Sequence, residues 1–410
     1  MIFDKLKQHK KIIENFSYLS VLQIISLIFP IITYPYLIKV LGAETYGTIV
    51  FSQAVVIYFN IFIVFGFNFT AVRDVSLHRN NPKKLSEIVS AITIIKSFFF
   101  IISFSIFLGY ILLFEPKIDY TLYILSFWIC INEILFPSWF FQGIEEMKYI
   151  TFINFGIRIF FLLMIFILIK SPKDYLFFPL LNGIGALLAG VISFSLLYGK
   201  YKLQLIKVPL KTLIEYIKSS YHLFISNVSI QIYANASKII IGNFLGMKDV
   251  TYYDLAEKIV NIGKIPHGMI GQVLYPKISL EKNVLFLRKV LVYTFCFNTF
   301  LYLLAFSFSN VIMNYFGGDA IVLRILFLNV PIIGFSNVLM VLTLLPFGYN
   351  KLFTKIIFAS FISYIIIISS LYITNTISLY SLTFANVGVE IIVSLLSYFS
   401  VKINKILQYE

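Results

Sequence analysis

The sequence is poor in charge and in cysteine. Only 13% of its 410 residues are charged, whereas 59% are hydrophobic, and the mean hydropathy is +0.90. Soluble domains of this size do not reach such values, so an integral membrane protein is predicted. The two cysteines, Cys130 and Cys296, lie in apolar runs and are interpreted as packing residues, which excludes a disulfide or metal framework built on cysteine.

Motifs of catalysis are also missing. The four histidines have no metal-ligand spacing, and the chain has no Gly-rich phosphate loop of the P-loop kind. Every predicted external loop is short, whereas membrane glycosyltransferases and sugar polymerases need groups that meet their substrate outside the bilayer. We therefore expect neither an enzyme nor a bound cofactor or metal ion.

Long apolar runs dominate the rest of the chain. Runs of about twenty residues, the length that crosses ~30 Å of hydrocarbon, begin near Phe16, Tyr46, Ile88, Thr121, Ile150, Leu176, His222, Thr251, Val290, Ala320, Thr354 and Ile377. They predict an all-α integral membrane protein of about twelve transmembrane helices.

The basic residues between these runs indicate an orientation. With a cytoplasmic N-terminus, the inner connections hold most lysines and arginines, in clusters that include residues 5–11, 73–84, 200–218 and 277–289. The outer connections hold only Lys39, Lys117, Lys170, Lys173 and Lys248. The positive-inside rule then places both termini in the cytoplasm. Topology thus explains most of the net charge of +14, and nucleic acid is not an expected partner.

The longest polar connection divides the chain into two halves. We expect an N-terminal six-helix lobe over residues 1–200, a cytoplasmic linker over 201–221 and a C-terminal six-helix lobe over 222–410. A gapless shift of 204 residues lays Leu41 and Gly42 on Leu245 and Gly246, which points to an internal repeat. Two lobes related by a repeat, with substrate held between them, are a common transporter plan.

Polar residues follow one face of four runs. On a helix, Asn227, Gln231 and Lys238 share a face of the seventh run, and Gln23 and Tyr34 lie on the corresponding face of the first. The eighth run carries Asp254, Glu257, Lys258, Asn261 and Lys264 within one arc, and the same shift relates Gln53 and Asn60 of the second run to it. A charge at the bilayer centre costs about 3 kcal/mol on insertion scales. Lys238 and Lys264 should therefore line a water-filled cavity or pair internally.

Other interpretations of these residues stay open. Lys96, Arg158, Arg324 and Lys238 lie near predicted helix ends, from which they could extend to the headgroups. Asn227, Gln231 and Asn235 could form hydrogen bonds between helices, and Asp254 with Lys258 could be a local i,i+4 ion pair. Glu133 and Glu390 could be proton or ion sites, or packed neutral carboxyls.

Three segments resemble a known family. They are YPYLIKVLGAETYG (34–47), FGFNFTAVRDVS (65–76) and PSWFFQGIEEMKYI (137–150). They resemble the signature segments of bacterial polysaccharide-unit flippases, the O-antigen or capsule repeat-unit exporters of the multidrug/oligosaccharidyl-lipid/polysaccharide exporter superfamily. The likeness runs along most of the chain, and the residues that carry it are Leu41, Gly42, Tyr46, Gly47, Gly66, Arg73, Trp139, Gln142 and Gly143. Val250 and Thr251 stand where the repeat would put Tyr and Gly, so the repeat is degenerate there.

The resemblance implies a V-shaped pair of lobes in the bacterial inner membrane, with a cavity lined by the first, second, seventh and eighth spans. It implies that oligosaccharide repeat units on undecaprenyl diphosphate are flipped from the cytoplasmic to the periplasmic leaflet by alternating access, in lipopolysaccharide (O-antigen) or capsule biosynthesis. Implied partners are this lipid-linked oligosaccharide, membrane lipids, H⁺ or Na⁺ as a coupling ion, and a polysaccharide polymerase with its chain-length regulator.

The polar faces and the resemblance together give a set of candidate site residues. Those expected to line the substrate cavity are Gln23, Tyr34, Gln53, Asn60, Asn227, Gln231, Lys238, Glu257, Asn261 and Lys264. Candidates for phosphate binding or ion coupling are Arg73, Arg158 and Asp254.

Two alternative functions remain. Drug/cation exporters of the same superfamily share this architecture, and Asp254 and Glu257 are residues that a cationic cargo would need. Lys258 and Lys264 favour an anionic cargo instead. A polytopic sugar polymerase is the other alternative, although no large external loop with clustered charged residues supports it.

Overall fold

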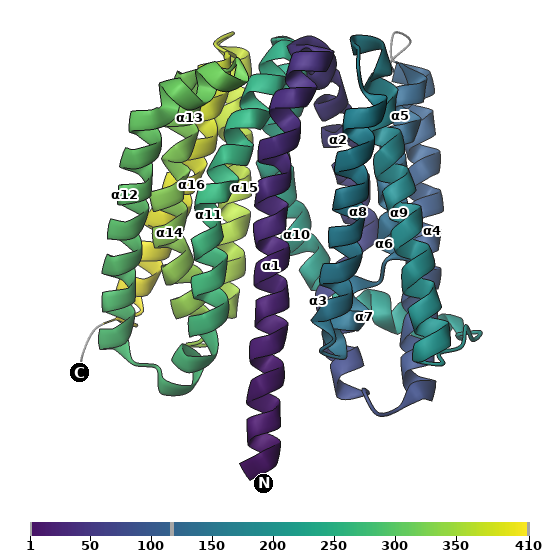
Figure 1. Cartoon of the computed structure of the whole chain (residues 1–410). Helices are drawn as coiled ribbons and strands as arrows, with labels where there is room; N and C mark the ends of the chain where they lie inside the picture. Colours follow the sequence, from purple (N-terminus) through teal and green to yellow (C-terminus); the bar gives the residue numbers. More distant parts are fainter. Residues whose placement is uncertain (1, 115–118, 408–410) are drawn as a thin grey trace. The chain divides into compact units, whose positions relative to one another are not determined.

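The computed structural model describes residues 2–114 and 119–407, so Lys117 of the expected outer connections lies outside the described residues. All elements in this part of the chain are helices (Figure 1). The chain divides into two compact units, which we call unit 1 (Met1–Val228) and unit 2 (Ser229–Glu410). Their boundary lies inside α10, Leu210–Phe244, which contributes residues to both units.

Unit 1 contains long helices and one interrupted span. In chain order its elements are α1 (Ile2–Leu41), α2 (Ala43–Val64), α3 (Phe67–Leu77), α4 (Pro82–Phe114), α5 (Tyr120–Phe127), η1 (Trp128–Ile131), α6 (Asn132–Leu135), α7 (Ser138–Gly143), α8 (Met147–Leu168), η2 (Pro172–Leu176), α9 (Phe177–Ser195) and η3 (Leu196–Lys200). The interrupted span runs from α5 to α7. α8 lies between α1 and α9, contacting both, and α9 also contacts α5, η1 and α6.

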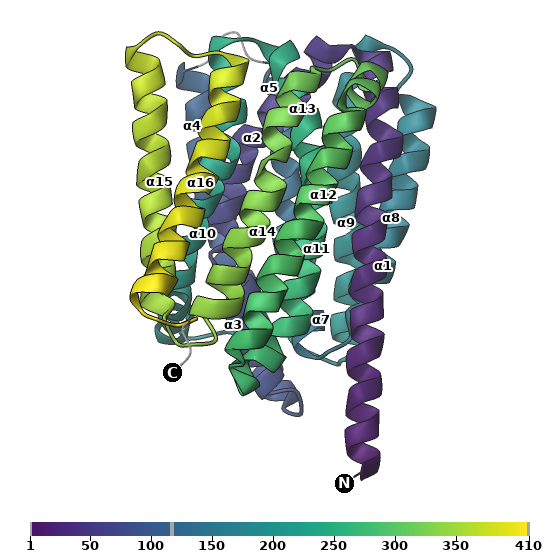
Figure 2. The same cartoon turned by 90° about the vertical axis from the view of Figure 1, so that its left-hand side faces the viewer.

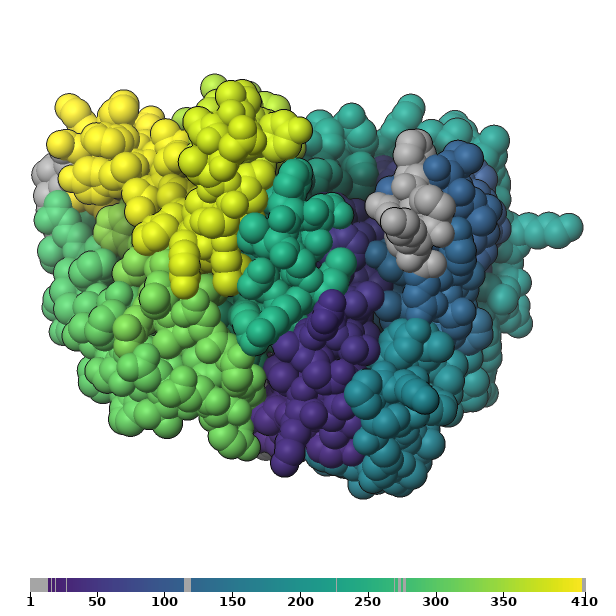
Figure 3. Space-filling view, turned by 90° about the horizontal axis from the view of Figure 1, so that it is seen from above, coloured from purple at the N-terminus to yellow at the C-terminus, as the bar shows by residue number. Residues whose placement is uncertain are grey.

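Unit 2 contains the remaining helices. They are α11 (Met247–Glu281), α12 (Val284–Phe316), α13 (Ala320–Phe327), α14 (Asn329–Leu339), η4 (Met340–Leu344), α15 (Asn350–Ile373) and α16 (Leu379–Ile403). α16 packs against α13, α14 and α15, and these helices run side by side along the unit (Figure 2). Seen along the helices, the green surface of unit 2 adjoins its yellow C-terminal part, where α13 contacts α16 (Figure 3).

Ten segments of the described chain are long and apolar enough to cross a membrane. Six belong to unit 1 and four to unit 2, and most begin within a few residues of the expected positions. The two remaining expected spans fall on α10 and α11, each 35 residues long. Both carry polar and charged residues along their length and are not among the ten. The protein is thus an all-helical, multi-pass membrane protein with ten rather than twelve candidate spans.

The expected linker is helical over much of its length. α10 begins at Leu210, directly after Pro209, whose carbonyl accepts a hydrogen bond from the Leu213 N–H at 3.2 Å. Proline suits a helix start, because the first turn leaves its N–H positions without helical acceptors. Residues 210–221 therefore continue into the polar face of α10 without a break.

Matching sets of contacts occur in the two units. In unit 1 Asp119 caps α5, accepting from the Leu122 N–H at 3.2 Å, and also accepts from the Tyr175 hydroxyl. In unit 2 Asp319 caps α13, accepting from the Ile321 N–H at 2.7 Å and from the Tyr380 hydroxyl at 2.7 Å. A capping box starts the last span in both cases, at Ser171 before η2 and at Ser378 before α16. These matched contacts support the internal repeat.

Two glycines let α9 approach the interrupted span closely. A Cβ at Gly183 would lie 3.1 Å from the Trp128 ring, and one at Gly190 would lie 2.6 Å from Leu135 Cβ. Gly183 and Gly190 are seven residues apart, as are Trp128 and Leu135, so two faces with the same spacing pack together. This packing fixes one wall of the cavity described next.

Candidate functional site

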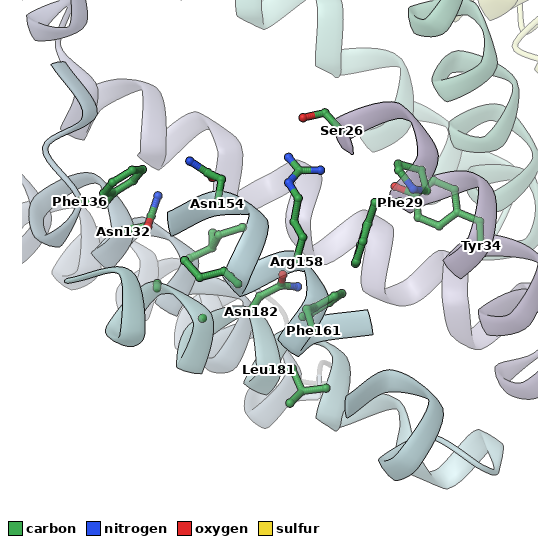
Figure 4. A pocket seen from close by; sticks show the side chains of 15 residues that line it. Ser26, Phe29, Tyr34, Asn132, Phe136, Asn154, Arg158, Phe161, Leu181 and Asn182 are labelled. Carbon is green, nitrogen blue, oxygen red and sulfur yellow. The ribbon is translucent and has the colours of Figure 1, made fainter. Parts of the chain in front are cut away.

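A cavity of about 440 Å³ lies inside unit 1 (Figure 4). It is lined by α1, the interrupted span, α8 and α9. Its polar lining residues are Ser26, Tyr34, Asn132, Asn154, Arg158 and Asn182. Phe29, Phe136 and Phe161 supply aromatic surface. All of these residues belong to segments that are long and apolar enough to cross a membrane.

Local sequence explains why these side chains face one cavity. Asn154 and Arg158 are four residues apart on α8 and therefore share a face. Ser26, Pro30 and Tyr34 repeat the same spacing on α1. Pro30 has no N–H, so the Ser26 carbonyl loses its helical donor at the cavity wall. In a membrane, backbone without its helical partner is tolerated where it faces a cavity or other protein groups.

Arg158 is the charged group of this cavity. It extends toward Ser26, with Asn154 on one side and Phe29 on the other (Figure 4). Its guanidinium carbon lies 5.9 Å from the centre of the Phe29 ring. Arg158 forms no ion pair within the described chain, and no acidic residue is among those that line the cavity.

The lining has the chemistry of a site for an anionic, hydroxylated group. A guanidinium stays protonated and presents a planar set of N–H donors that matches phosphate or carboxylate oxygens. Each of the three asparagines can both donate to and accept from hydroxyl groups. Residues 2–114 and 119–407 contain no group of three His, Cys, Asp or Glu placed to hold a metal ion.

Lys238 and Lys258 of unit 2 form ion pairs. Lys238 Nζ lies 2.9 Å from Asp254 Oδ1 and 2.6 Å from Glu257 Oε2, and Lys258 Nζ lies 2.5 Å from Asp254 Oδ2. The Asp254 side chain is 3% exposed. Of the two options for Lys238, a water-filled cavity or internal pairing, the structure shows the pairing. This charge cluster balances two ammonium groups with two carboxylates.

The other polar residues of unit 2 have varied surroundings. Lys264 is partly buried and interacts electrostatically with Glu390 and Glu257, whereas Asn261 is exposed. The amide of Asn235 donates to Gln231 Oε1 at 3.0 Å within α10. That bond joins two residues of one helix, although the sequence also allowed bonds between helices.

The predicted site residues of unit 1 are divided. Tyr34 and Arg158 line the cavity together, whereas Gln23 on α1 and Gln53 and Asn60 on α2 are not among its lining residues. Asn227 is partly buried on α10. The side chain of Arg73 is 65% exposed on α3 and bonds to Asp74 at 3.0 Å.

Sequence reasoning missed four polar lining residues, Ser26, Asn132, Asn154 and Asn182. The i,i+4 pair of Asn154 and Arg158 was a usable signal, because two polar residues on one face of an apolar helix need a shared polar surrounding. Asn132 and Asn182 are single amides in apolar runs, and their meeting depends on tertiary packing.

The chain resembles transporters in sequence and in fold. It is 26% identical over 362 residues to a protein of Escherichia coli K12 named "Putative O-antigen transporter", with 85% of this chain and 86% of that protein aligned. A protein of the same name from Shigella dysenteriae is 24% identical over 340 residues, covering 80% and 85% of the two chains.

Solved structures show the same fold at low identity. A multidrug resistance MATE family transporter of the MOP superfamily, in an inward-facing conformation, matches with a TM-score of 0.69 at 11% identity, covering 96% of this chain and 99% of the other. The Vibrio cholerae MATE transporter VcmN in its bent form matches with a TM-score of 0.62 at 10% identity, covering 97% of both chains. The protein therefore has a MATE-like fold, and its similarities are to transporters rather than to enzymes, as the sequence predicted.

A protein-family model described as "Polysaccharide biosynthesis protein" matches residues 12–282. This match covers more than half of the chain. The chain therefore belongs to the polysaccharide biosynthesis protein family.

Proposed function

We propose that the protein is a flippase for oligosaccharide repeat units linked to undecaprenyl diphosphate. It moves them from the cytoplasmic to the periplasmic leaflet of the bacterial inner membrane by alternating access, for O-antigen or capsule biosynthesis. Family membership and two relatives named for O-antigen transport support this proposal. The observation that carries it is a lone guanidinium among three carboxamides in segments that are long and apolar enough to cross a membrane.

The charge of the cavity selects among possible cargoes. A diphosphate-linked sugar combines negative phosphate oxygens with many hydroxyls, and the lining offers a partner for each. Arg158 would bind the phosphate oxygens, and Asn132, Asn154 and Asn182 would bind hydroxyl groups. Phe29, Phe136 and Phe161 would pack against the apolar faces of the sugar rings.

An exporter of cationic drugs is less well supported. Such a cargo needs an unpaired carboxylate in its cavity, and the unit 1 cavity is lined by none. Asp254 and Glu257 remain the acidic candidates, but Lys238 and Lys258 neutralise them. A cation entering that cluster would have to displace a bound ammonium group.

The proposal includes a topology and partners. Both termini would face the cytoplasm, and α10 and α11 would cross the membrane as two further spans, with polar faces that include Asn227, Gln231, Glu257, Asn261 and Lys264 turned toward the transport path. Gln23, Gln53 and Asn60 would join this path in the first half of the chain. H⁺ or Na⁺ would drive the cycle, and a polysaccharide polymerase with its chain-length regulator would receive the product.

A reconstituted assay tests the function. The purified chain is placed in liposomes that carry a labelled undecaprenyl-diphosphate oligosaccharide, and an impermeant enzyme reports the fraction of lipid in the outer leaflet over time. Arg158→Ala should slow turnover about tenfold or more, since a hydrogen bond to a charged group contributes about 1.5–3 kcal/mol. Arg158→Lys should keep part of the rate, because it retains charge without the planar donors.

The control for this variant is Lys211→Ala, which removes one positive charge from an exposed position of unit 1. It should turn over like the parent protein. Equal rates for Arg158→Ala and the parent would remove Arg158 from the site. If the parent moves no lipid but takes up a cationic dye under an ion gradient, the drug exporter is the better description.

A further inference from the structure

The span over Tyr120–Gly143 is broken beside the cavity. α6 ends at Leu135 and α7 begins at Ser138, with Phe136 and Pro137 between them. A proline has no N–H, so the Glu133 carbonyl, four residues earlier, has no helical donor. Lipid offers no replacement, and a carbonyl in this position needs a partner from the protein.

Lys96 of α4 supplies that partner. Its ammonium nitrogen lies 3.0 Å from the Glu133 carbonyl oxygen and 3.2 Å from Glu133 Oε2. The lysine is 1% exposed, although lysine is almost never fully buried unless it is paired. Three N–H donors on one nitrogen allow both bonds at once. Lys96 therefore does not extend to the headgroups, and Glu133 is ion-paired rather than a separate site.

The bonded carbonyl lies between two residues of the cavity wall. Asn132 directly precedes Glu133, and Phe136 stands at the break, where its N–H donates to the Asn132 carbonyl at 2.9 Å. On the other side, Gly183 and Gly190 of α9 hold Trp128 and Leu135 of the same segment. The segment is thus fixed by packing on one side and by the Lys96 ammonium on the other.

We propose that Lys96 is a positioning residue for the cavity: by donating to the Glu133 carbonyl that Pro137 leaves without a donor, it holds the broken span so that Asn132 and Phe136 face Arg158. The role needs a hydrogen-bond donor at position 96 and does not need a positive charge. It does not require Lys96 to touch cargo. Its relevance to transport rests on the proposed function of the cavity.

The test distinguishes a requirement for a hydrogen-bond donor at position 96 from a requirement for a positive charge there. All proteins in the series carry Glu133→Met, which removes both side-chain oxygens and leaves the backbone carbonyl as the partner. The series then compares the native Lys96 with Lys96→Gln and Lys96→Met. Asn132→Cys, in a background with Cys130 and Cys296 replaced by alanine, reports the cavity wall through its rate of reaction with N-ethylmaleimide.

If the proposal is right, the cysteine at position 132 reacts with N-ethylmaleimide in the Lys96→Gln variant at a rate within twofold of that in the protein that keeps Lys96. The reason is that the glutamine amide still donates a hydrogen bond. The Lys96→Met variant differs from both by at least fivefold. Equal labelling rates for Lys96→Gln and Lys96→Met would overturn the donor role. If Lys96→Met yields too little folded protein, Pro137→Ala is added. It returns an N–H to position 137 and should restore the yield, and a failure to do so would equally contradict the proposal.

The labelling rate does not depend on cargo, so it stands apart from the proposed function. In the flipping assay, Lys96→Met with native Asn132 should slow turnover, and Asn132→Ala should slow it as well. A changed labelling rate with unchanged flipping would keep Lys96 as a positioning residue and show that the cavity is not the cargo site.

Discussion

Lys238 is held by two carboxylates, Asp254 and Glu257, and its side chain is only 14% exposed. Removing one member of a buried ion pair leaves an uncompensated charge, which typically costs about 3 kcal/mol or more. Lys238→Met should therefore lower the free energy of unfolding by about 3 kcal/mol. Adding Glu257→Gln should recover part of the loss, because Glu257 is the carboxylate left without an ammonium partner, whereas Asp254 keeps Lys258. Thermal unfolding of the detergent-solubilised proteins measures both effects.

The same pair of variants separates structure from transport. If Lys238 serves cargo instead, Lys238→Met will unfold like the parent protein but will flip lipid more slowly, and Glu257→Gln will not restore the rate. That result would return Lys238 to the substrate cavity, in which its position on the polar face of α10 first placed it.

At the residue scale, the sequence predicts which side chains are unusual but not which partners they have. Lys238, Lys96 and Arg158 are all basic residues in apolar surroundings, and their spacing places each on a helix face. Only packing reveals that Lys238 meets two carboxylates, that Lys96 meets a carbonyl, and that Arg158 shares its cavity with three amides and no acid. Periodicity gives directions and carries no information on neighbouring helices.

Between elements, the contact of α9 with the interrupted span depends on glycine. A Cβ at Gly190 would lie 2.6 Å from Leu135 Cβ, and no rotamer of Leu135 can move that atom away. Gly190→Ala should therefore push the helices apart and cost about 1–3 kcal/mol of stability. Gly156→Ala on α8 is the matched control, since a Cβ there meets nothing within 4 Å. It should leave stability unchanged or raise it, because alanine favours helix more than glycine does.

Unfolding midpoints of the two glycine variants check this prediction. A Gly190→Ala protein as stable as the Gly156→Ala protein would mean that α9 does not pack against Leu135 as described. The cavity wall should shift with the same substitution, because Asn132 lies on the segment that α9 supports.

Helices are the part of the fold that the sequence predicts best. Long apolar runs end at charged or turn-forming residues, and most candidate spans begin close to the expected positions. Pro137 can be read from the sequence, and it predicts the break at Phe136 and Pro137. The contacts made at the break cannot be predicted, because the sequence does not show that α4 is a neighbour. α10 and α11 show the opposite case, in which helices of 35 residues carry enough polar side chains to fall short of the apolar composition of a span.

For the whole molecule, the signature segments of the first half predict the family, and the family model covers residues 12–282. The MATE-like fold follows the same expectation. The described cavity of unit 1 is lined by α1, the interrupted span, α8 and α9. Its amides come from three consecutive spans of the chain. The cavity that the sequence predicts, lined by the first, second, seventh and eighth spans, stays a prediction.

Because the fold is shared with multidrug transporters, cargo choice must come from the charges in the site. The proposed flippase should therefore prefer a diphosphate-linked oligosaccharide to a neutral prenyl glycoside with the same sugars. A guanidinium bond to phosphate worth about 1.5–3 kcal/mol corresponds to a preference of roughly tenfold or more. Arg158→Ala should lose this preference mainly by slowing the charged lipid, and paired flipping rates in the same liposomes measure it. A preference that survives in Arg158→Ala would assign phosphate selection to the polar faces of α10 and α11, and Lys264 would then be the residue to substitute next.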